Sequence, residues 1–126
     1  MKPRLLIVDD EPDLVDSLVM ALEDGFEVHT AKNGRIALDR LTGEPFEVVL
    51  LDLMMPVISG EDLLRALDGK PHPPIVVLSA SRDLHETCAR FGVTHYLQKP
   101  FRLPALLAKI ADARRGASGS GTTSRT

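Results

Sequence analysis

The sequence predicts an α/β fold in which a single parallel sheet is covered by helices on both faces. Two observations lead to this expectation. Short apolar stretches with the composition of β-strands alternate along the chain with segments whose apolar residues recur at helical spacing. The chain also offers no hairpin between consecutive strands, so each pair is joined by a right-handed crossover, which makes the strands parallel.

Five strands are expected, and most of them are followed by a polar side chain. Their ranges are residues 5–8, 26–31, 48–51, 75–78 and 95–98. The third is a run of four apolar residues, which is typical of a strand buried on both faces of a sheet. The second is less apolar and is expected nearer to an edge. The other four strands are followed by Asp9-Asp10, Asp52, Ser79-Ala80 and Lys99-Pro100.

These polar residues indicate a functional site at one edge of the sheet. Open α/β folds keep their ligand crevice at the carboxyl ends of the parallel strands. Acids, a hydroxyl and an amine that all follow strands are therefore expected along the same edge. For Asp52 taken alone, the alternative that it merely begins a loop stays open.

Five helices are expected between and after the strands. They cover residues 12–25, 34–43, 60–68, 81–90 and 103–114. Pro12 suits the first turn of a helix, and Asn33-Gly34, although a hairpin dipeptide, leads into helical spacing. The segment 81–90 has only a thin apolar stripe, which makes it a candidate mobile element. The last helix is expected to face the core with Leu103, Leu106, Leu107 and Ile110.

The composition is that of one soluble globular domain, and it narrows the function. The 126 residues are 44% hydrophobic and 26% charged, with a net charge of −3. This weak negative charge gives no electrostatic case for binding nucleic acid or an anionic membrane. No apolar run is long enough to span a bilayer, and the N-terminus lacks a signal-peptide layout. The single Cys88 excludes an internal disulfide and fits the cytoplasm, which is the expected location.

Taken in order, the polar motifs resemble those of the receiver (response regulator) domains of two-component signalling, of the chemotaxis-regulator type. The motifs are Asp9-Asp10, Asp52 with Met55-Pro56 and Gly60, Ser79-Ala80, and Tyr96 three residues before Lys99-Pro100-Phe101. The resemblance covers about residues 3–115, so we expect a receiver domain at 1–115 and a flexible tail or linker start at 116–126. It implies a doubly wound, flavodoxin-like, five-stranded sheet in the order 2-1-3-4-5.

Three carboxylates that converge in one crevice need a counter-charge. Two unit charges about 4 Å apart repel by roughly 4 kcal/mol at an effective dielectric constant of 20. With oxygen ligands and no His or Cys nearby, Mg²⁺ is the expected cation. Four histidines lie on different elements without metal-ligand spacing and are expected to be structural or solvent-facing. They are His29, His72, His85 and His95.

The resemblance implies a role for each acid. Asp52 would accept a phosphoryl group from a phosphohistidine of a sensor histidine kinase or a histidine phosphotransfer protein. Asp10 and Asp52 would bind Mg²⁺ directly, and Asp9 would bind it through water. The backbone carbonyl of Met54 would add another oxygen. A carboxylate is a competent nucleophile for this transfer when the developing charge is neutralised.

The resemblance also implies roles for residues after the fourth and fifth strands. Lys99 would pair with Asp52 before the reaction, and Lys99 and Ser79 would hold the phosphoryl group after it. Tyr96 would turn inward as Ser79 moves, which would change the surface formed by the fourth helix, fifth strand and fifth helix. The alternative that Tyr96 is only a half-buried strand aromatic stays open. The bond before Pro100 is expected to be cis.

The expected function is phosphorylation-dependent signalling and not enzymatic turnover. The output would pass to a downstream protein target or to the protein's own output domain, and a phosphorylation-dependent homodimer is a further expected form. Two alternatives stay open. The chain could be a degenerate receiver used only for docking, or the receiver of a larger DNA-binding regulator or hybrid kinase.

Two other classes fit the sequence less well. A phosphatase with an aspartyl-phosphate intermediate needs a second acid two residues after the nucleophile, where this chain has Met54. Many receivers have a polar residue there, and we expect Met54 to limit the approach of water or a partner to the acyl phosphate. A nucleotide- or flavin-binding module would need a glycine fingerprint that the first strand–helix turn lacks.

Overall fold

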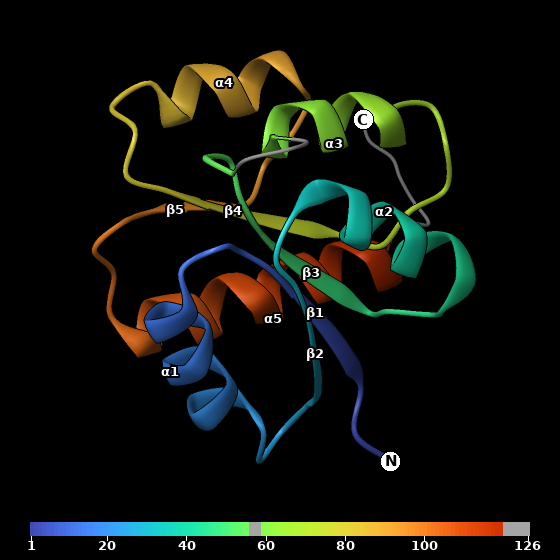
Figure 1. The fold of residues 1–126 in the computed structure, drawn as a ribbon, viewed down its shortest axis with the longest axis vertical. Coiled ribbons are helices and arrows are strands. Elements are labelled where there is room, and N and C mark those ends of the chain that lie inside the picture. The colour runs from blue at the N-terminus through green and yellow to red at the C-terminus, as the bar shows by residue number, and fades with distance from the viewer. Residues whose placement is uncertain (56–58, 120–126) are drawn as a thin grey trace.

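The computed structural model describes residues 1–55 and 59–119, with side chains to residue 116 (Figure 1). Pro56 and the segment 120–126, which belong to the expected motif and the expected tail, lie outside the described residues. The strands are β1 (Arg4–Val8), β2 (Glu27–Ala31), β3 (Val48–Asp52), β4 (Ile75–Ser79) and β5 (Tyr96–Gln98). The helices are α1 (Pro12–Leu22), α2 (Gly34–Gly43), α3 (Gly60–Leu67), α4 (Leu84–Arg90) and α5 (Leu103–Gly119).

The five strands form one parallel sheet in the order β2-β1-β3-β4-β5. Helices α1 and α5 cover one face, and α2, α3 and α4 cover the other (Figure 1). The chain therefore has the doubly wound α/β architecture expected from its alternating pattern, and the strand order implied by the resemblance is confirmed.

Alternation along β3 explains how one strand supplies two cores. Val48 and Leu50 pack with residues of α1 and α5, whereas Val49 and Leu51 pack with residues of α2, α3 and α4. All four side chains are fully buried. Because successive side chains of a strand point to opposite faces, only a continuous apolar run can fill both layers. This central strand holds Asp52 in place at its carboxyl end.

Helix caps follow the local sequence. The Asn33 side chain accepts a hydrogen bond of 2.9 Å from the backbone N–H of Ile36, which begins α2 instead of closing a hairpin. At the start of α3, the Ser59 hydroxyl accepts from the backbone N–H of Asp62 at 3.1 Å, and the Asp62 carboxylate accepts from the Ser59 N–H. This reciprocal capping box starts α3.

Helix α5 differs from the expectation in two ways. Leu106 and Ile110 are buried as predicted, but the prediction was wrong for Leu103 and Leu107, which are 40% and 42% exposed. Since α1 shares the same face of the sheet, α5 needs only a narrow apolar stripe to close the core. The helix also runs to Gly119, past the expected end at Arg114.

Smaller differences concern element ends. Helix α1 ends at Leu22, before the expected stop near Gly25, because the backbone N–H groups of Gly25 and Phe26 both donate to the Leu22 carbonyl and close the last turn. Helix α4 begins at Leu84 instead of residue 81. Ahead of it, the Ser81 hydroxyl accepts from the backbone N–H of Asp83 in a local turn that competes with helix.

Gly60 is the point where α3 approaches the end of β3 most closely. A Cβ atom at this position would lie 2.5 Å from the Asp52 carbonyl oxygen and 2.5 Å from the Leu53 Cα. The Gly60 N–H also donates to the Leu53 carbonyl at 3.1 Å. Both clashing atoms belong to the backbone and cannot turn away as a side chain could.

We therefore expect Gly60→Ala to destabilise the fold by about 1–3 kcal/mol, as overpacking of a close backbone contact does. The matched control is Gly43→Ala, because no atom lies within 4 Å of a Cβ at Gly43. That change should alter the free energy of unfolding by less than about 1 kcal/mol. Urea denaturation followed by circular dichroism measures both, and equal stability of the two variants would contradict the steric argument.

Candidate functional site

Three carboxylates meet at the carboxyl ends of β1 and β3. Asp9 and Asp10 follow β1, and Asp52 is the last residue of β3. One carboxylate oxygen from each lies within 4.8 Å of the others. The chain leaves β1 for α1 on one face of the sheet, and it leaves β3 for α3 on the other face. Open α/β folds place their ligand crevice at such a switch point. The predicted convergence of the three acids is therefore present.

Backbone hydrogen bonds fix the two buried acids. The backbone N–H of Glu11 donates to the Asp9 carboxylate at 2.9 Å, and the backbone N–H of Met54 donates to the Asp52 carboxylate at 3.2 Å. Asp9 and Asp52 are almost fully buried, whereas Asp10 is exposed. Two of the acids are thus desolvated and oriented, while the third remains open to solvent.

Lys99 brings a positive charge to this cluster. Its Nζ lies 3.2 Å from Asp9 Oδ2, 3.8 Å from Asp52 Oδ1 and 3.0 Å from Glu11 Oε1. The backbone N–H of Lys99 donates to the Ser79 carbonyl at 2.8 Å, and the Lys99–Pro100 bond is cis, as expected. The loop after β5 is therefore anchored to β4 and directs the lysine into the acidic crevice.

Ser79 and Tyr96 come from the two strands beside the acids. Ser79 is fully buried at the end of β4, one residue past Leu78, which pairs with Asp52. Its hydroxyl accepts from the backbone N–H of Ser81 at 3.1 Å. Tyr96 is half-buried in β5, and its hydroxyl is hydrogen-bonded to Nδ1 of His85 on α4.

Burial and charge change the acid–base properties of the site. Burial, together with the negative charges of Asp9 and Asp10, raises the pKa of Asp52 to about 6, against the lowering effects of the Met54 N–H and of Lys99. Burial alone would lower the pKa of Lys99. The hydrogen bond to Glu11 and the charges of Asp52 and Asp9 outweigh burial and raise that pKa. The lysine is thus held as a cation, and Asp52 takes up a proton readily when no metal is bound.

The donor set fits a small hard cation. It consists of carboxylate oxygens only, two of them buried and one facing solvent, which suits an ion that keeps part of its water shell. The single ammonium group of Lys99 does not neutralise the three acids together with Glu11. Asp9, Asp10 and Asp52 could therefore hold Mg²⁺, whose charge would compensate for the desolvation of Asp52.

The sequence interpretation missed the roles of two residues. It treated Glu11 only as part of a helix start, whereas its carboxylate contacts Lys99. The available signal was its position directly after Asp9-Asp10 at the end of a strand. It treated His85 as structural or solvent-facing, and the ring is exposed but touches Tyr96. No sequence spacing links those two residues, because they lie on separate elements.

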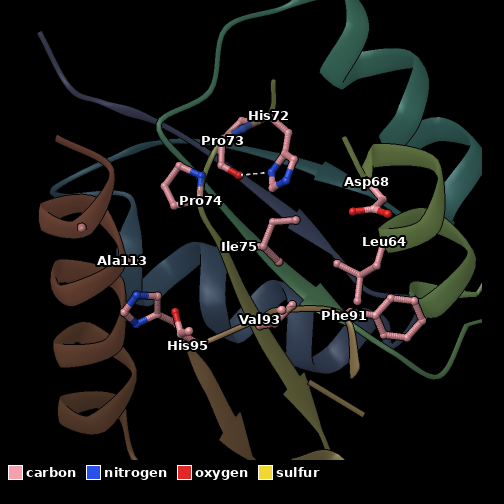
Figure 2. Close-up of a pocket in the computed structure, with 13 residues that line it drawn as sticks. Leu64, Asp68, His72, Pro73, Pro74, Ile75, Phe91, Val93, His95 and Ala113 are labelled. Atoms are coloured by element: carbon pink, nitrogen blue, oxygen red, sulfur yellow. Dashed lines mark hydrogen bonds between the residues drawn. The ribbon is translucent and has the colours of Figure 1, made fainter. Parts of the chain in front are cut away.

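A different pocket lies at the opposite edge of the sheet, where β4 and β5 begin (Figure 2). It encloses about 520 Å³ and is lined by residues that include Leu64, Ile75, Phe91, Val93 and His95. None of the clustered acids lines it. Burial lowers the pKa of His95, which favours a neutral ring there. The pocket lining includes Asp68 and His72 but no cluster of three acids like that of the crevice, so the crevice remains the candidate site.

The raised pKa of Asp52 makes the metal-free fold sensitive to pH. Because the folded state binds this proton more tightly than the unfolded chain, the stabilising contribution is complete below about pH 4 and is lost as the pH rises through about 6. We expect Asp52→Asn to raise the free energy of unfolding by roughly 2 kcal/mol at pH 7.5 without metal, and by much less at pH 4.

Urea denaturation at the two pH values, in a chelating buffer, measures this effect. Asp16→Asn is the matched control because Asp16 is exposed on α1. A loss of stability in Asp52→Asn at pH 7.5 would contradict the argument from desolvation.

Comparison with known proteins points to one family. The family model described as response regulator receiver domain matches residues 5–111. The chain is similar to the transcriptional regulatory protein PrrA of Mycobacterium leprae, with 37% identity over 96% of this chain and 54% of PrrA. It is also similar to the sensor histidine kinase TmoS of Ectopseudomonas mendocina, with 36% identity over 88% of this chain and 12% of TmoS.

Among solved structures, the receiver domain of Francisella response regulator 1452 matches with a TM-score of 0.84 and 26% identity, over 92% of this chain and 99% of that one. The chain spans about half the length of the regulators it matches, or less. Within residues 1–55 and 59–119, none of the helices has the length and apolar character that a membrane span requires. Since one family model accounts for nearly all of its strands and helices, the chain belongs to the response regulator receiver domain family.

Proposed function

We propose that this receiver domain accepts a phosphoryl group on Asp52 and signals through the resulting change in its surface. The observation that carries the proposal is the cluster of Asp9, Asp10 and Asp52 with Lys99 at the switch point of the sheet. Placing three acids and an ammonium group in one crevice has a large desolvation cost, which a purely structural role does not explain. A site that must receive a dianionic group and a cation explains that cost.

The transfer itself needs few protein groups. A carboxylate oxygen of Asp52 attacks the phosphorus of a phosphohistidine, the P–N bond breaks, and the histidine nitrogen leaves with the bonding electron pair and takes up a proton. When bound by Asp9, Asp10 and Asp52, Mg²⁺ would neutralise charge on the acids and on the phosphoryl oxygens. Lys99 would pair with the phosphoryl group, and the Ser79 hydroxyl would donate to another of its oxygens.

Water ends the signal by attacking the phosphorus of the acyl phosphate, which breaks the P–O bond and regenerates the Asp52 carboxylate. The backbone carbonyl of Met54 is the proposed additional metal ligand. Met54 is 69% exposed and follows Asp52 by two residues, so its side chain would lie where water or a partner approaches the acyl phosphate. An apolar side chain there offers no hydrogen bond to orient the attacking water.

The proposed switch runs from Ser79 to Tyr96. The two residues lie on neighbouring strands, where Val77 pairs with Tyr96 and Ser79 pairs with Gln98. A movement of the Ser79 hydroxyl toward a phosphoryl group would open space that the Tyr96 ring could fill. The surface of α4, β5 and α5 would then change for a downstream protein, an output domain or a second copy of the chain.

The proposed phosphoryl donors are a sensor histidine kinase or a histidine phosphotransfer protein. The similarity to regulators and to a sensor kinase supports a place in such a pathway. The matched proteins are longer than the matched region, which also supports the alternative that this receiver controls a larger DNA-binding regulator or hybrid kinase.

Incubation with acetyl phosphate and Mg²⁺ tests the acceptor. We expect one added phosphoryl group in the intact-protein mass spectrum, lost in Asp52→Asn and in the presence of a chelator. Asp13→Asn is the control, because Asp13 is an exposed acid in the first turn of α1 and should leave the modification intact. Wild-type protein that gains no phosphoryl group would favour the docking-only alternative, and repeated turnover of small phosphomonoesters would favour a phosphatase.

A second measurement tests the effect of Met54 on the lifetime. We expect Met54→Asn to change the dephosphorylation rate constant by about three- to tenfold, and to increase it, because the amide can orient water near the acyl phosphate. Decay of the phosphorylated protein after removal of the donor measures the rate. Met20→Asn is the control, since Met20 is equally exposed but lies on α1. An unchanged rate in Met54→Asn would contradict this role.

A further inference from the structure

Lys99 has a third partner that the proposed chemistry does not use. Its Nζ is closest to Glu11 Oε1, at 3.0 Å, compared with 3.8 Å to Asp52 Oδ1. The lysine side chain is only 15% exposed, and Asp9 Oδ2 lies 3.2 Å from the same nitrogen. Glu11 therefore shares the cation with the acids that would hold the metal.

The position of Glu11 is built into the start of α1. Its backbone N–H is held by the Asp9 carboxylate at 2.9 Å, and its backbone is extended at the helix N-cap. The side chain then reaches across to the loop after β5, where Lys99 lies. Since 61% of the Glu11 side chain is exposed, the ion pair adds little to stability. The Glu11–Lys99 ion pair is therefore expected to act on the position of the Lys99 ammonium group and not on stability.

A lysine that sits directly on Asp52 would compete with a metal ion for the same oxygens. The Asp52 carboxylate accepts one hydrogen bond from the Met54 N–H, and its other ligand positions are needed for the cation and for the phosphoryl donor. The exposed carboxylate of Glu11, together with the buried carboxylate of Asp9, draws the ammonium group away from Asp52. The lysine remains near enough to contact a phosphoryl group after its transfer to Asp52.

We propose that Glu11 is a positioning residue that holds Lys99 beside Asp52 instead of on it, and thereby keeps Asp52 available to a divalent cation. This inference rests on the proposed function, in which the cation site and the phosphoryl acceptor share Asp52. It assigns to Glu11 no contact with the reacting atoms. Glu11 acts through the position of the lysine.

Isothermal titration with Mg²⁺ alone tests the inference on the full chain. Glu11→Asp keeps the charge and shortens the side chain by one methylene group, so it loses the reach to Lys99 but not the electrostatic attraction. We expect Glu11→Asp to weaken Mg²⁺ binding by about three- to fivefold, the range of a lost exposed ion pair. In a Lys99→Met background the same substitution should have no effect, because no lysine then competes.

Two comparisons distinguish an effect of Glu11 through Lys99 from a general effect of negative charge on Mg²⁺ affinity. Asp13 is exposed, lies two residues after Glu11 and is not among the ion-pair partners of Lys99, so the Mg²⁺ affinity of Asp13→Asn measures the long-range effect of charge alone. Glu11→Gln should weaken binding more than Asp13→Asn does. Equal Mg²⁺ affinity of Glu11→Asp and wild type would overturn the inference, as would a loss of equal size in the Lys99→Met background. Because the titration contains no phosphoryl donor, it stands apart from the acetyl phosphate experiment, which alone decides whether Asp52 is the acceptor.

Discussion

The repulsion among buried carboxylates is the constraint around which this structure is arranged. Asp9 and Asp52 are removed from water at the ends of adjacent strands, with Asp10 at the rim. Burial, reinforced by the negative charges of Asp9 and Asp10, raises the pKa of Asp52 to about 6, and the same repulsion favours any cation that enters. The central sheet supports this arrangement, because residues Leu5–Val8 of β1 pair with Val48–Leu51 of β3 and all of these side chains are buried. A weaker scaffold could relax by spreading the acids apart.

The sequence was sufficient for the fold and for most of the site, and particular residues explain why. The run Val48–Leu51 is typical of a strand buried on both faces, and acids that follow parallel strands are expected along one edge of the sheet. Asp9, Asp10, Asp52 and Lys99 were predictable for that reason. The order of the strands came from the resemblance and could not be obtained from periodicity, since several right-handed arrangements satisfy the same alternation.

The remaining features depend on contacts between elements that no local pattern records. Leu103 and Leu107 have the spacing of core residues, but the face of the sheet was already covered by α1, so they remain exposed. Glu11 has the sequence context of a helix start, and its partner Lys99 lies far away in the sequence, in the loop after β5. The hydrogen bond between His85 and Tyr96 likewise joins a helix to a strand that the sequence could not pair. Side-chain partners across elements are set by the assembled fold.

The close approach of Gly60 to the end of β3 has a mechanical consequence. With no Cβ atom between them, the first turn of α3 rests directly on the backbone that carries Asp52, and a hydrogen bond to Leu53 ties the two together. The backbone at Asp52 and the start of α3 are thus held together. A shift of the peptide backbone at Asp52 would therefore displace the beginning of α3 as well, through backbone contact alone and without an intermediary side chain.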